Sequence, residues 1–322
     1  MTSFCALQIV IPVYEDWESV SRLLPMVDEQ LVAANISADI LLVDDCSQQP
    51  RPITWKVPWN GIHAIRVLRL KRNLGHQRAI CIALCHLNQQ TEWERVLIMD
   101  GDGEDSPTDI PKLIAELEQS NSSRVVFAER TRRSEGYIFA FFYFLYRALH
   151  WILVGHRIRV GNFSVMDRQC LESLCVSWEL WNHYAAAVFA CRQPMSFVAT
   201  ARGERLAGKS KMRFADLVMH GLSALSVFSD RISTRLLLFS AGGTIIATAG
   251  LALLTATRLF TDYGIPDWAT NAFGISTLLL AQIVAFILIA CFVVLFTRGL
   301  NQFIPTRDFE HFVLKVEETT HG

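Results

Sequence analysis

The sequence predicts an α/β protein with a mainly parallel sheet, followed by membrane-surface helices and a two-helix transmembrane hairpin. Two observations support this. Short β-rich runs alternate with helical patterns up to about residue 130, and two long uncharged apolar runs lie near the C-terminus. Strands separated by helices indicate βαβ crossovers, which build parallel sheets. An apolar run of more than ~20 residues is long enough to cross the bilayer core.

The bulk composition narrows the class of protein. The 322 residues suffice for a catalytic domain and an additional element, and the net charge of -1 implies no general attraction to nucleic acid or anionic surfaces. Eight cysteines, none in a CxxC pair, lie in or beside apolar stretches, which favours reduced thiols in the cytosol over disulfides or zinc. The apolar segment at residues 7–11 is too short for a signal peptide, so we expect the first domain to be cytosolic.

The first domain is predicted to place several polar clusters at one edge of its sheet. We expect strands at residues 6–11, 39–44, 65–70, 95–99 and 124–128, and helices near 18–34, 76–89 and 109–119. Three of these strands end in polar clusters, at residues 12–16, 44–47 and 100–102. In open parallel sheets ligands bind at the carboxyl ends of the strands. That edge is therefore the predicted site.

The cluster after the fourth strand is the most informative. It follows the apolar run 96–98 and holds four acids and two glycines: Asp100, Gly101, Asp102, Gly103, Glu104 and Asp105. Carboxylates this close repel one another, and Mg²⁺ or Mn²⁺ would relieve that repulsion because these cations prefer oxygen ligands. The alternative is a solvated acidic turn in which the glycines supply unusual backbone angles.

Two apolar runs, at residues 236–257 and 273–296, are predicted to form a membrane-spanning hairpin, with a buried helical hairpin as the alternative. Arginines at 231, 235, 298 and 307 flank the pair, whereas the connection at 258–271 holds Arg258 against two aspartates. The positive-inside rule therefore places both chain ends in the cytosol. The apolar segments 137–155 and 214–228 contain polar residues, among them Arg147 and His220. We expect them to be membrane-surface helices, with ordinary core helices as the alternative.

Five short motifs resemble those of the family 2 glycosyltransferases, which have a Rossmann-like GT-A fold. They are VIPVYED (residues 10–16), VDDCS (43–47), RNLGH (72–76), DGDGED (100–105) and RLAGKSK (205–211). The likeness covers nearly the whole chain. It is closest to the polyprenyl-phosphate glycosyltransferase branch, which includes the dolichol-phosphate mannose synthases. On this basis we expect a cytosolic GT-A domain at 1–212, a juxtamembrane helix at 213–231, two transmembrane helices within 232–298 and a cytosolic tail at 299–322.

The resemblance implies residue roles. A UDP- or GDP-linked sugar would be the donor and a polyprenyl phosphate, undecaprenyl or dolichyl, the acceptor. The nucleotide pocket would include Pro12, Tyr14, Asp16 and Asp45. Mg²⁺ or Mn²⁺ would bind Asp102 and Glu104, with Asp100 and Gly101 beside the diphosphate and Asp100, Asp102 and Asp105 as catalytic candidates. Phosphates of donor and acceptor would meet Arg130, Arg205 and Lys211, and the acceptor phosphate also Arg133 and Ser210. The oligomeric state stays open, a homo-oligomer included.

The sequence also departs from the family pattern. Glu104 stands where Gln is usual, Gly101 where Ala is usual, and Asn162 where many relatives carry Asp. Met212 follows Lys211 where Tyr is frequent, and the tail lacks the R-P-x-Y of many relatives. These changes bear on sugar specificity and acceptor contacts rather than on the reaction class.

Several candidate residues have simpler explanations. The arginines at 130, 132 and 133 could form a solvated basic turn or bind anionic lipid instead of a substrate phosphate. Asp44 and Asp45 could cap a turn, and His76 could simply begin a helix rather than face an anion. The segment 181–184 (WNHY) could line a sugar or acceptor pocket, although aromatic packing explains it as well.

The predicted reaction is displacement at the anomeric carbon of a nucleotide sugar with inversion of its configuration. A lipid phosphate acceptor is already anionic, so it needs no strong general base. A hydroxyl acceptor on a glycolipid or glycan would need one, for which Asp105 is the candidate. A third hypothesis is a non-catalytic membrane scaffold that binds nucleotide sugars, but the intact acidic run argues against it.

Overall fold

The computed structural model describes residues 6–49, 59–120, 124–130, 152–155, 160–208, 214–260, 267–298 and 303–319. The chain forms two compact units. The first, which we call the catalytic unit, consists of Met1–Ala140, Ile158–Val227 and Phe303–Gly322. The second, the hairpin unit, consists of Phe141–Arg157 and Phe228–Gln302. The catalytic unit is therefore completed by residues that follow the hairpin in sequence.

The catalytic unit is built on one eight-stranded sheet in the order β7-β5-β6-β4-β1-β2-β3-β8. Its strands are β1 (Leu7–Val13), β2 (Ala38–Asp44), β3 (Ile62–Leu70), β4 (Arg95–Ile98), β5 (Val125–Arg130), β6 (Val160–Asp167), β7 (Met195–Thr200) and β8 (Val313–Thr319). Strand β6 runs antiparallel to both its neighbours and β8 runs antiparallel to β3, whereas all other pairs are parallel. The predicted GT-A-like, mainly parallel sheet is confirmed.

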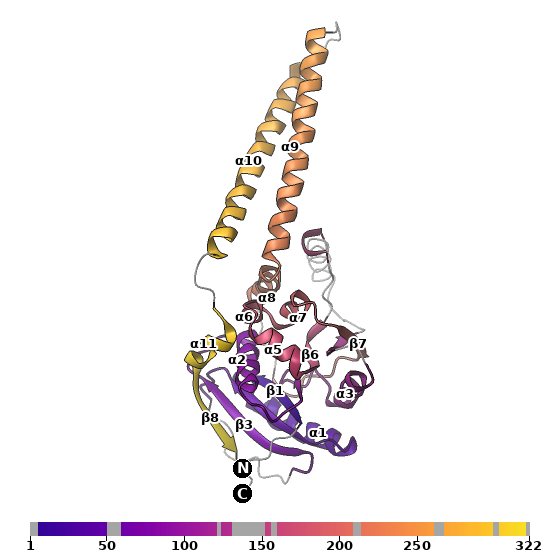
Figure 1. Ribbon diagram of the computed structural model, residues 1–322, viewed down its shortest axis with the longest axis vertical. Coiled ribbons are helices and arrows are strands. Elements are labelled where there is room, and N and C mark those ends of the chain that lie inside the picture. The colour runs from indigo at the N-terminus through magenta and orange to yellow at the C-terminus, as the bar shows by residue number, and fades with distance from the viewer. Residues whose placement is uncertain are drawn as a thin grey trace. The chain divides into compact units, whose positions relative to one another are not determined.

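Helices cover both faces of this sheet (Figure 1). On one face α1 (Trp17–Ala33) and α3 (Ile110–Gln119) pack over one alternating set of strand side chains. On the other face α2 (His76–Asn88), α5 (Arg168–Cys175) and α7 (Tyr184–Ala190) cover the complementary set. The interior strands β1 and β2 are buried on both faces, as expected for a parallel sheet between two helical layers.

Shorter elements complete the unit. They are η1 (Pro107–Asp109), α6 (Glu179–Asn182), α8 (Phe214–Ser226), α11 (Pro305–Asp308) and η2 (Phe309–Phe312). The five predicted strands and three predicted helices are all present, with boundaries shifted by at most three residues. Three strands, β6, β7 and β8, were not predicted. The predicted helix at 137–155 lies largely outside the described residues.

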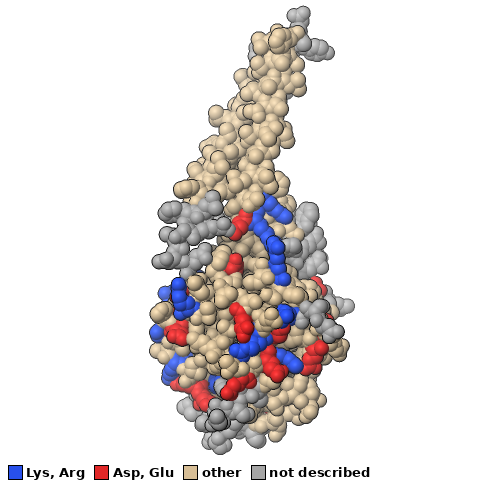
Figure 2. Space-filling view, viewed as in Figure 1, with Lys and Arg blue, Asp and Glu red and all other residues tan. Residues whose placement is uncertain are grey.

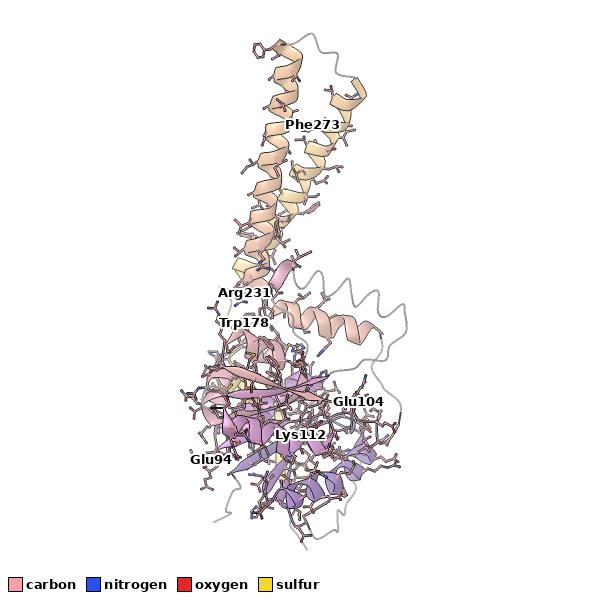
Figure 3. All side chains as sticks on the ribbon, turned by 90° about the vertical axis from the view of Figure 1, so that its right-hand side faces the viewer. Glu94, Glu104, Lys112, Trp178, Arg231 and Phe273 are labelled. Atoms are coloured by element: carbon pink, nitrogen blue, oxygen red, sulfur yellow. The ribbon has the colours of Figure 1, made fainter. Side chains whose placement is uncertain are left out.

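The hairpin unit contains two long helices, α9 (Ser229–Phe260) and α10 (Asp267–Arg298). Each contains an apolar window long enough to cross a membrane, and only 6% of each window is buried. In Figure 2 the visible face of these helices shows no charged residue over most of its length. They approach closely, because a Cβ at Gly250 would lie 2.8 Å from the ring of Phe273, which Figure 3 labels. Such exposed apolar helices favour membrane association over a buried core hairpin.

Candidate active site

The site lies where the parallel strands β1, β2 and β4 end. These strands pair in register, so their carboxyl ends meet at one edge of the sheet. The loop after β4 is the acidic run, which we call the acidic loop (residues 100–105). The loops after β1 and β2 contribute Asp16 and Asp45.

The acidic loop is held in shape by its own carboxylates. The buried Asp105 side chain accepts a hydrogen bond from the backbone N–H of Asp100 (2.9 Å). Asp102 accepts one from the N–H of Glu104 (3.0 Å), and Gly103 adopts a φ of 87° that favours glycine. The side chains of Asp102 and Glu104 stay about one-fifth exposed (20% and 21%). The loop therefore turns one acid inward and presents two outward.

A second segment, residues 202–207, lies directly on the acidic loop. The N–H of Gly203 donates to the carbonyl of Glu104 (2.8 Å), and the N–H of Leu206 donates to the carbonyl of Asp102 (2.9 Å). The backbones are so close that a Cβ at Gly203 would lie 2.4 Å from the carbonyl oxygen of Gly103. We call residues 202–207 the docking segment.

The docking segment brings two arginines to the acids. Arg205 donates from one guanidinium nitrogen to Asp102 (2.9 Å) and from the other to Asp16 (2.7 Å). Arg202 donates to Glu104 through two nitrogens, at 2.6 and 3.0 Å. Sequence reasoning named Arg205 but missed Arg202, whose only signal was its position three residues earlier. Figure 3 labels Glu104 at this place.

Burial raises the pKa of Asp102, and the charges of Glu104 and Asp105 add to that effect, while Arg205 opposes it. Keeping the carboxylates of this loop ionised therefore costs free energy, and the guanidinium groups of Arg205 and Arg202 offset part of that cost. The repulsion inferred from the sequence is present in the structure. In the part of the chain that is described, arginines are the cations that relieve it.

The residues present suit a hard divalent cation. Among the described residues no three His, Cys, Asp or Glu side chains converge as a ready-made metal cage. Mg²⁺, however, usually takes only one or two protein carboxylates and completes its shell with water and substrate phosphates. Asp102 and Glu104 match that donor set in number and type, although each is paired with an arginine, and Asp100 lies in the same loop.

Asp100 is connected to the protein interior by two amide side chains. Asn162 on β6 donates to Asp100 (3.2 Å), and Gln77 on α2 donates to Asn162 (2.9 Å). Gln77 in turn accepts the backbone N–H of Tyr184 at the start of α7 (2.7 Å). Both amide side chains are buried. The departure Asn162 thus contacts a predicted site residue, whereas Gln77 was missed because nothing in the sequence links residue 77 to residue 162.

Asp45 holds a loop. Its two carboxylate oxygens accept the backbone N–H groups of Leu74 (2.7 Å) and Gly75 (2.8 Å), within the RNLGH motif. The carboxylate is buried, and burial raises its pKa to about 6 against the opposing effect of these two hydrogen bonds. Neighbouring Asp44 accepts the N–H of Ser47 (2.8 Å), the turn-capping role considered for this pair. The structure thus places Asp45 between the second and third strand ends.

Of the remaining predicted site residues, some have side chains that the structure describes and others do not. Tyr14 is about half exposed (47%) at the same edge. Gly101 fits tightly, since a Cβ there would lie 3.1 Å from Ile11 and 3.3 Å from the carbonyl of Pro12. Arg130 ends β5, and its side chain is not described. Outside the described residues lie Arg132, Arg133, Ser210 and Lys211.

Solved structures with a similar fold include two enzymes. One is glucosyl-3-phosphoglycerate synthase from Mycobacterium tuberculosis in complex with Mn²⁺, UDP-glucose and phosphoglyceric acid, at 12% identity and a TM-score of 0.49, covering 71% of this chain and 80% of that one. The other is mannosyl-3-phosphoglycerate synthase from Rubrobacter xylanophilus, at 16% identity and a TM-score of 0.47, covering 71% and 74%.

Sequence relatives are more informative. An undecaprenyl-phosphate 4-deoxy-4-formamido-L-arabinose transferase from Klebsiella pneumoniae is 26% identical over 82% of this chain and 79% of its own length. The glycosyltransferase YkcC of Bacillus subtilis is 25% identical over 84% and 83%. A dodecaprenyl-phosphate galacturonate synthase from Rhizobium johnstonii is 27% identical over 39% and 37%. The family model for glycosyl transferase family 2 matches residues 8–175, more than half of the chain. This protein therefore belongs to glycosyl transferase family 2.

Proposed function

We propose that this glycosyltransferase is membrane-bound and moves a sugar from a nucleotide donor to a polyprenyl phosphate with inversion at the anomeric carbon. The observation that carries the proposal is the acidic loop under the two arginines of the docking segment, at the ligand-binding edge of the sheet. The exposed apolar helices α9 and α10 support a lipid acceptor. So do the names of relatives that use undecaprenyl and dodecaprenyl phosphate.

In this proposal the acids and arginines exchange partners when the donor binds. Asp102 and Glu104 would hold Mg²⁺ or Mn²⁺, which would supply Lewis-acid stabilisation of the departing diphosphate. Arg205 and Arg202, released from the carboxylates, then face phosphate oxygens, which guanidinium groups bind bidentately. Asp100, oriented through Asn162, lies beside the diphosphate.

The other predicted roles are retained as part of the proposal. Pro12, Tyr14 and Asp16 line the nucleotide pocket, while Asp45 shapes it through the 74–75 loop. The phosphates of donor and acceptor meet Arg130, Arg133, Ser210 and Lys211. Asp105 is buried and its carboxylate holds the backbone of Asp100, so we assign it to the shape of the loop. This favours a phosphate acceptor over a hydroxyl, because a hydroxyl acceptor would need a base.

Membranes carrying the protein test the reaction when they are incubated with radiolabelled nucleotide sugars and short polyprenyl phosphates, with and without Mn²⁺. We expect a product that mild acid cleaves, its loss in Asp102→Ala, and unchanged activity in the control Glu172→Ala, which replaces an exposed carboxylate on α5. A product resistant to mild acid would identify a hydroxyl acceptor. Metal-independent transfer would refute the metal role, and donor binding without any transfer would favour the scaffold.

We further propose that the catalytic unit and both chain ends lie on the cytosolic side. The arginines at 231, 235 and 298 flank the apolar helices and favour that side. Epitopes inserted at residue 264 and at the C-terminus of the chain test this in sealed inside-out vesicles. We expect antibody to reach the C-terminal epitope and not the one at 264. The reverse pattern would contradict the proposed topology.

A further inference from the structure

Three histidines from distant parts of the sequence meet beside the site. They are His76 at the start of α2, His183 before α7, and His220 on α8 (Figure 1). The ring of His220 lies 4.6 Å from that of His183 and 5.3 Å from that of His76, measured between centroids. None of the residue roles assigned above uses this histidine cluster.

The hydrogen bonds fix where the protons lie. Nδ1 of His183 accepts the backbone N–H of Ala186 (3.3 Å), so the proton of neutral His183 is on Nε2. That nitrogen faces Nε2 of His220 at 3.2 Å. Nε2 of His220 must therefore accept, and its own proton is on Nδ1. Two facing ring nitrogens share one proton.

The cluster adjoins the chain of contacts that reaches Asp100. His76 immediately precedes Gln77, and His183 immediately precedes Tyr184; these two neighbours are hydrogen-bonded to each other, and Gln77 also contacts Asn162. His220 belongs to α8, which the sequence predicts to lie at the membrane surface. The cluster thus adjoins the residues that connect to Asp100 and includes a residue of the helix expected to lie at the membrane surface.

Burial keeps the histidine cluster uncharged near neutral pH. Burial and, to a smaller extent, repulsion between the rings lower the pKa of His183 to about 3 and that of His220 to about 4, and burial lowers the pKa of His76 as well. No carboxylate contributes to these shifts among the described residues. The nearest charged groups in sequence are Arg78, two residues after His76, Glu179, four residues before His183, and Asp216, four residues before His220.

We propose that the histidine cluster binds the phosphate of the acceptor lipid together with the basic residues assigned to that phosphate above, with a phosphate oxygen entering between Nε2 of His183 and Nε2 of His220. This inference rests on the proposed function. The oxygen accepts a hydrogen bond from the N–H at Nε2 of His183, and His220 takes one proton from solvent on its own Nε2, so both nitrogens donate to the phosphate. Binding is therefore coupled to uptake of one proton, and the anion balances the positive charge that this proton brings.

Binding of farnesyl phosphate to the full-length protein tests this in detergent with EDTA and without donor, so that no metal contributes. Isothermal titration calorimetry gives the affinity, and buffers of different ionisation enthalpy give the proton uptake. We expect His220→Gln to weaken binding about tenfold, the loss of one charge-assisted hydrogen bond. The control His311→Gln, an exposed histidine of the tail, should bind as the unmodified protein does.

The pH dependence separates phosphate binding from simple packing of α8. Affinity should fall between about pH 6 and pH 8, because His220 must gain a proton, and this fall should be absent in His220→Gln. Unchanged affinity and pH dependence in His220→Gln would overturn the proposal. So would a pH dependence that disappears in Asp216→Asn, since that acid would then be the counter-ion. Weaker binding in His76→Gln, at a different element, would support it.

Two further measurements identify the ligand and distinguish failure of this inference from failure of the proposed function. Farnesol should not bind through the cluster, and inorganic phosphate should bind more weakly but with the same dependence on His220. Equal affinity for inorganic phosphate and farnesyl phosphate would assign the cluster to free phosphate instead of the lipid. If sugar transfer to polyprenyl phosphate is intact but insensitive to His220→Gln, this inference fails while the proposed function stands. If binding depends on His220 but no transfer occurs, the proposed function fails.

Discussion

At the scale of single residues, Arg205 is the side chain that would have to change partners for the proposed metal to bind. It bridges Asp102 and Asp16, so it satisfies the carboxylate that we assign to the metal. In Arg205→Ala we expect Mn²⁺ to bind roughly tenfold more tightly without donor, because a positive charge next to the ligand has gone. Sugar transfer should nevertheless fall. Electron paramagnetic resonance of free Mn²⁺ measures the first effect.

Two variants serve as references for Arg205→Ala. Arg205→Lys keeps the charge and loses the fork that binds two carboxylates, so its Mn²⁺ affinity should lie between those of the other two proteins. Arg168→Ala removes an arginine paired with Glu172 on α5 and should change neither quantity. Unaltered Mn²⁺ affinity in Arg205→Ala would show that the ion binds elsewhere.

Asp45 is the residue through which we expect mild acid to act on the site. Its pKa is about 6 in the folded protein, above the usual value of 3.8, mainly because it is buried. The folded protein therefore binds this proton more tightly than the unfolded chain does, and this group alone favours the folded state at pH 5 relative to pH 7. The protonated form, however, cannot accept the N–H groups of both Leu74 and Gly75 equally well.

We therefore expect the KM for the nucleotide sugar to rise as the pH falls through about 6, while the protein stays folded. Steady-state kinetics between about pH 5 and pH 8, with circular dichroism as the folding control, measure this. In Asp45→Asn the KM should be high at every pH, since an amide can accept from only one of its two ends. A KM that is flat with pH in the unmodified protein would contradict this role.

The residue scale also shows how far the sequence leads. Asp102, Glu104 and Arg205 were predictable because motifs and strand ends mark them. Arg202 and Gln77 were not, and His76 and the segment 181–184 were only weighed singly, because the contacts join segments about 40 to 145 residues apart that no local pattern encodes. Asp105 belongs to a predicted motif, but the sequence does not predict that its side chain turns inward and accepts a hydrogen bond from the backbone of Asp100.

At the scale of elements, the docking segment is held to the acidic loop by backbone contact. Gly203 leaves no room for a Cβ beside the carbonyl of Gly103, at 2.4 Å. In Gly203→Ala we expect the segment to separate from the loop, which moves both arginines away and lowers transfer at least tenfold. The sheet does not depend on this contact, so thermal unfolding should shift by only a few degrees. Transfer assays and differential scanning fluorimetry provide the two measurements.

Gly161→Ala is the matched control for this variant. Its Cβ would meet no atom within 4 Å, and its backbone needs no positive φ. Transfer should therefore be retained. Equal loss in both variants would mean that glycine flexibility matters rather than the close approach of residues 103 and 203.

Element prediction succeeded where the hydrophobic pattern repeats locally. Helices α1, α2 and α3 lie between strands of the set β1 to β5, with β2 followed directly by β3 among the described elements. Helices α1 and α3 bury one apolar face, whereas α2 is buried on most sides. Strand β6 was missed because a buried position holds Ser164, bound to Tyr184, which breaks the apolar pattern. Strand β8 was missed because its alternation ends in charges and its partner β3 lies some 250 residues earlier. Local pattern carries no information about such pairing.

At the scale of the whole molecule, the catalytic unit is discontinuous and closes only after the hairpin. The tail that follows α10 adds β8 to β3, places the buried ring of Phe309 in the core and stacks Phe303 against Trp181 at 4.0 Å between centroids. The backbone N–H of Lys71 also donates to the carbonyl of Phe312 (2.9 Å). The tail is thus a structural part of the domain that precedes the membrane helices.

A chain that stops at Val227 should therefore be less stable than one in which residues 303–319 are rejoined through a flexible linker in place of the hairpin. Loss of the buried Phe309 ring alone costs about 3–5 kcal/mol, and urea unfolding measures the difference. Within the rejoined chain, Phe309→Ala should be destabilising by a similar amount, whereas Leu314→Ala, an exposed position on β8, should change stability little. Equal stability of the shortened and rejoined chains would mean that the domain folds without its eighth strand, and that the tail adds nothing to the free energy of unfolding.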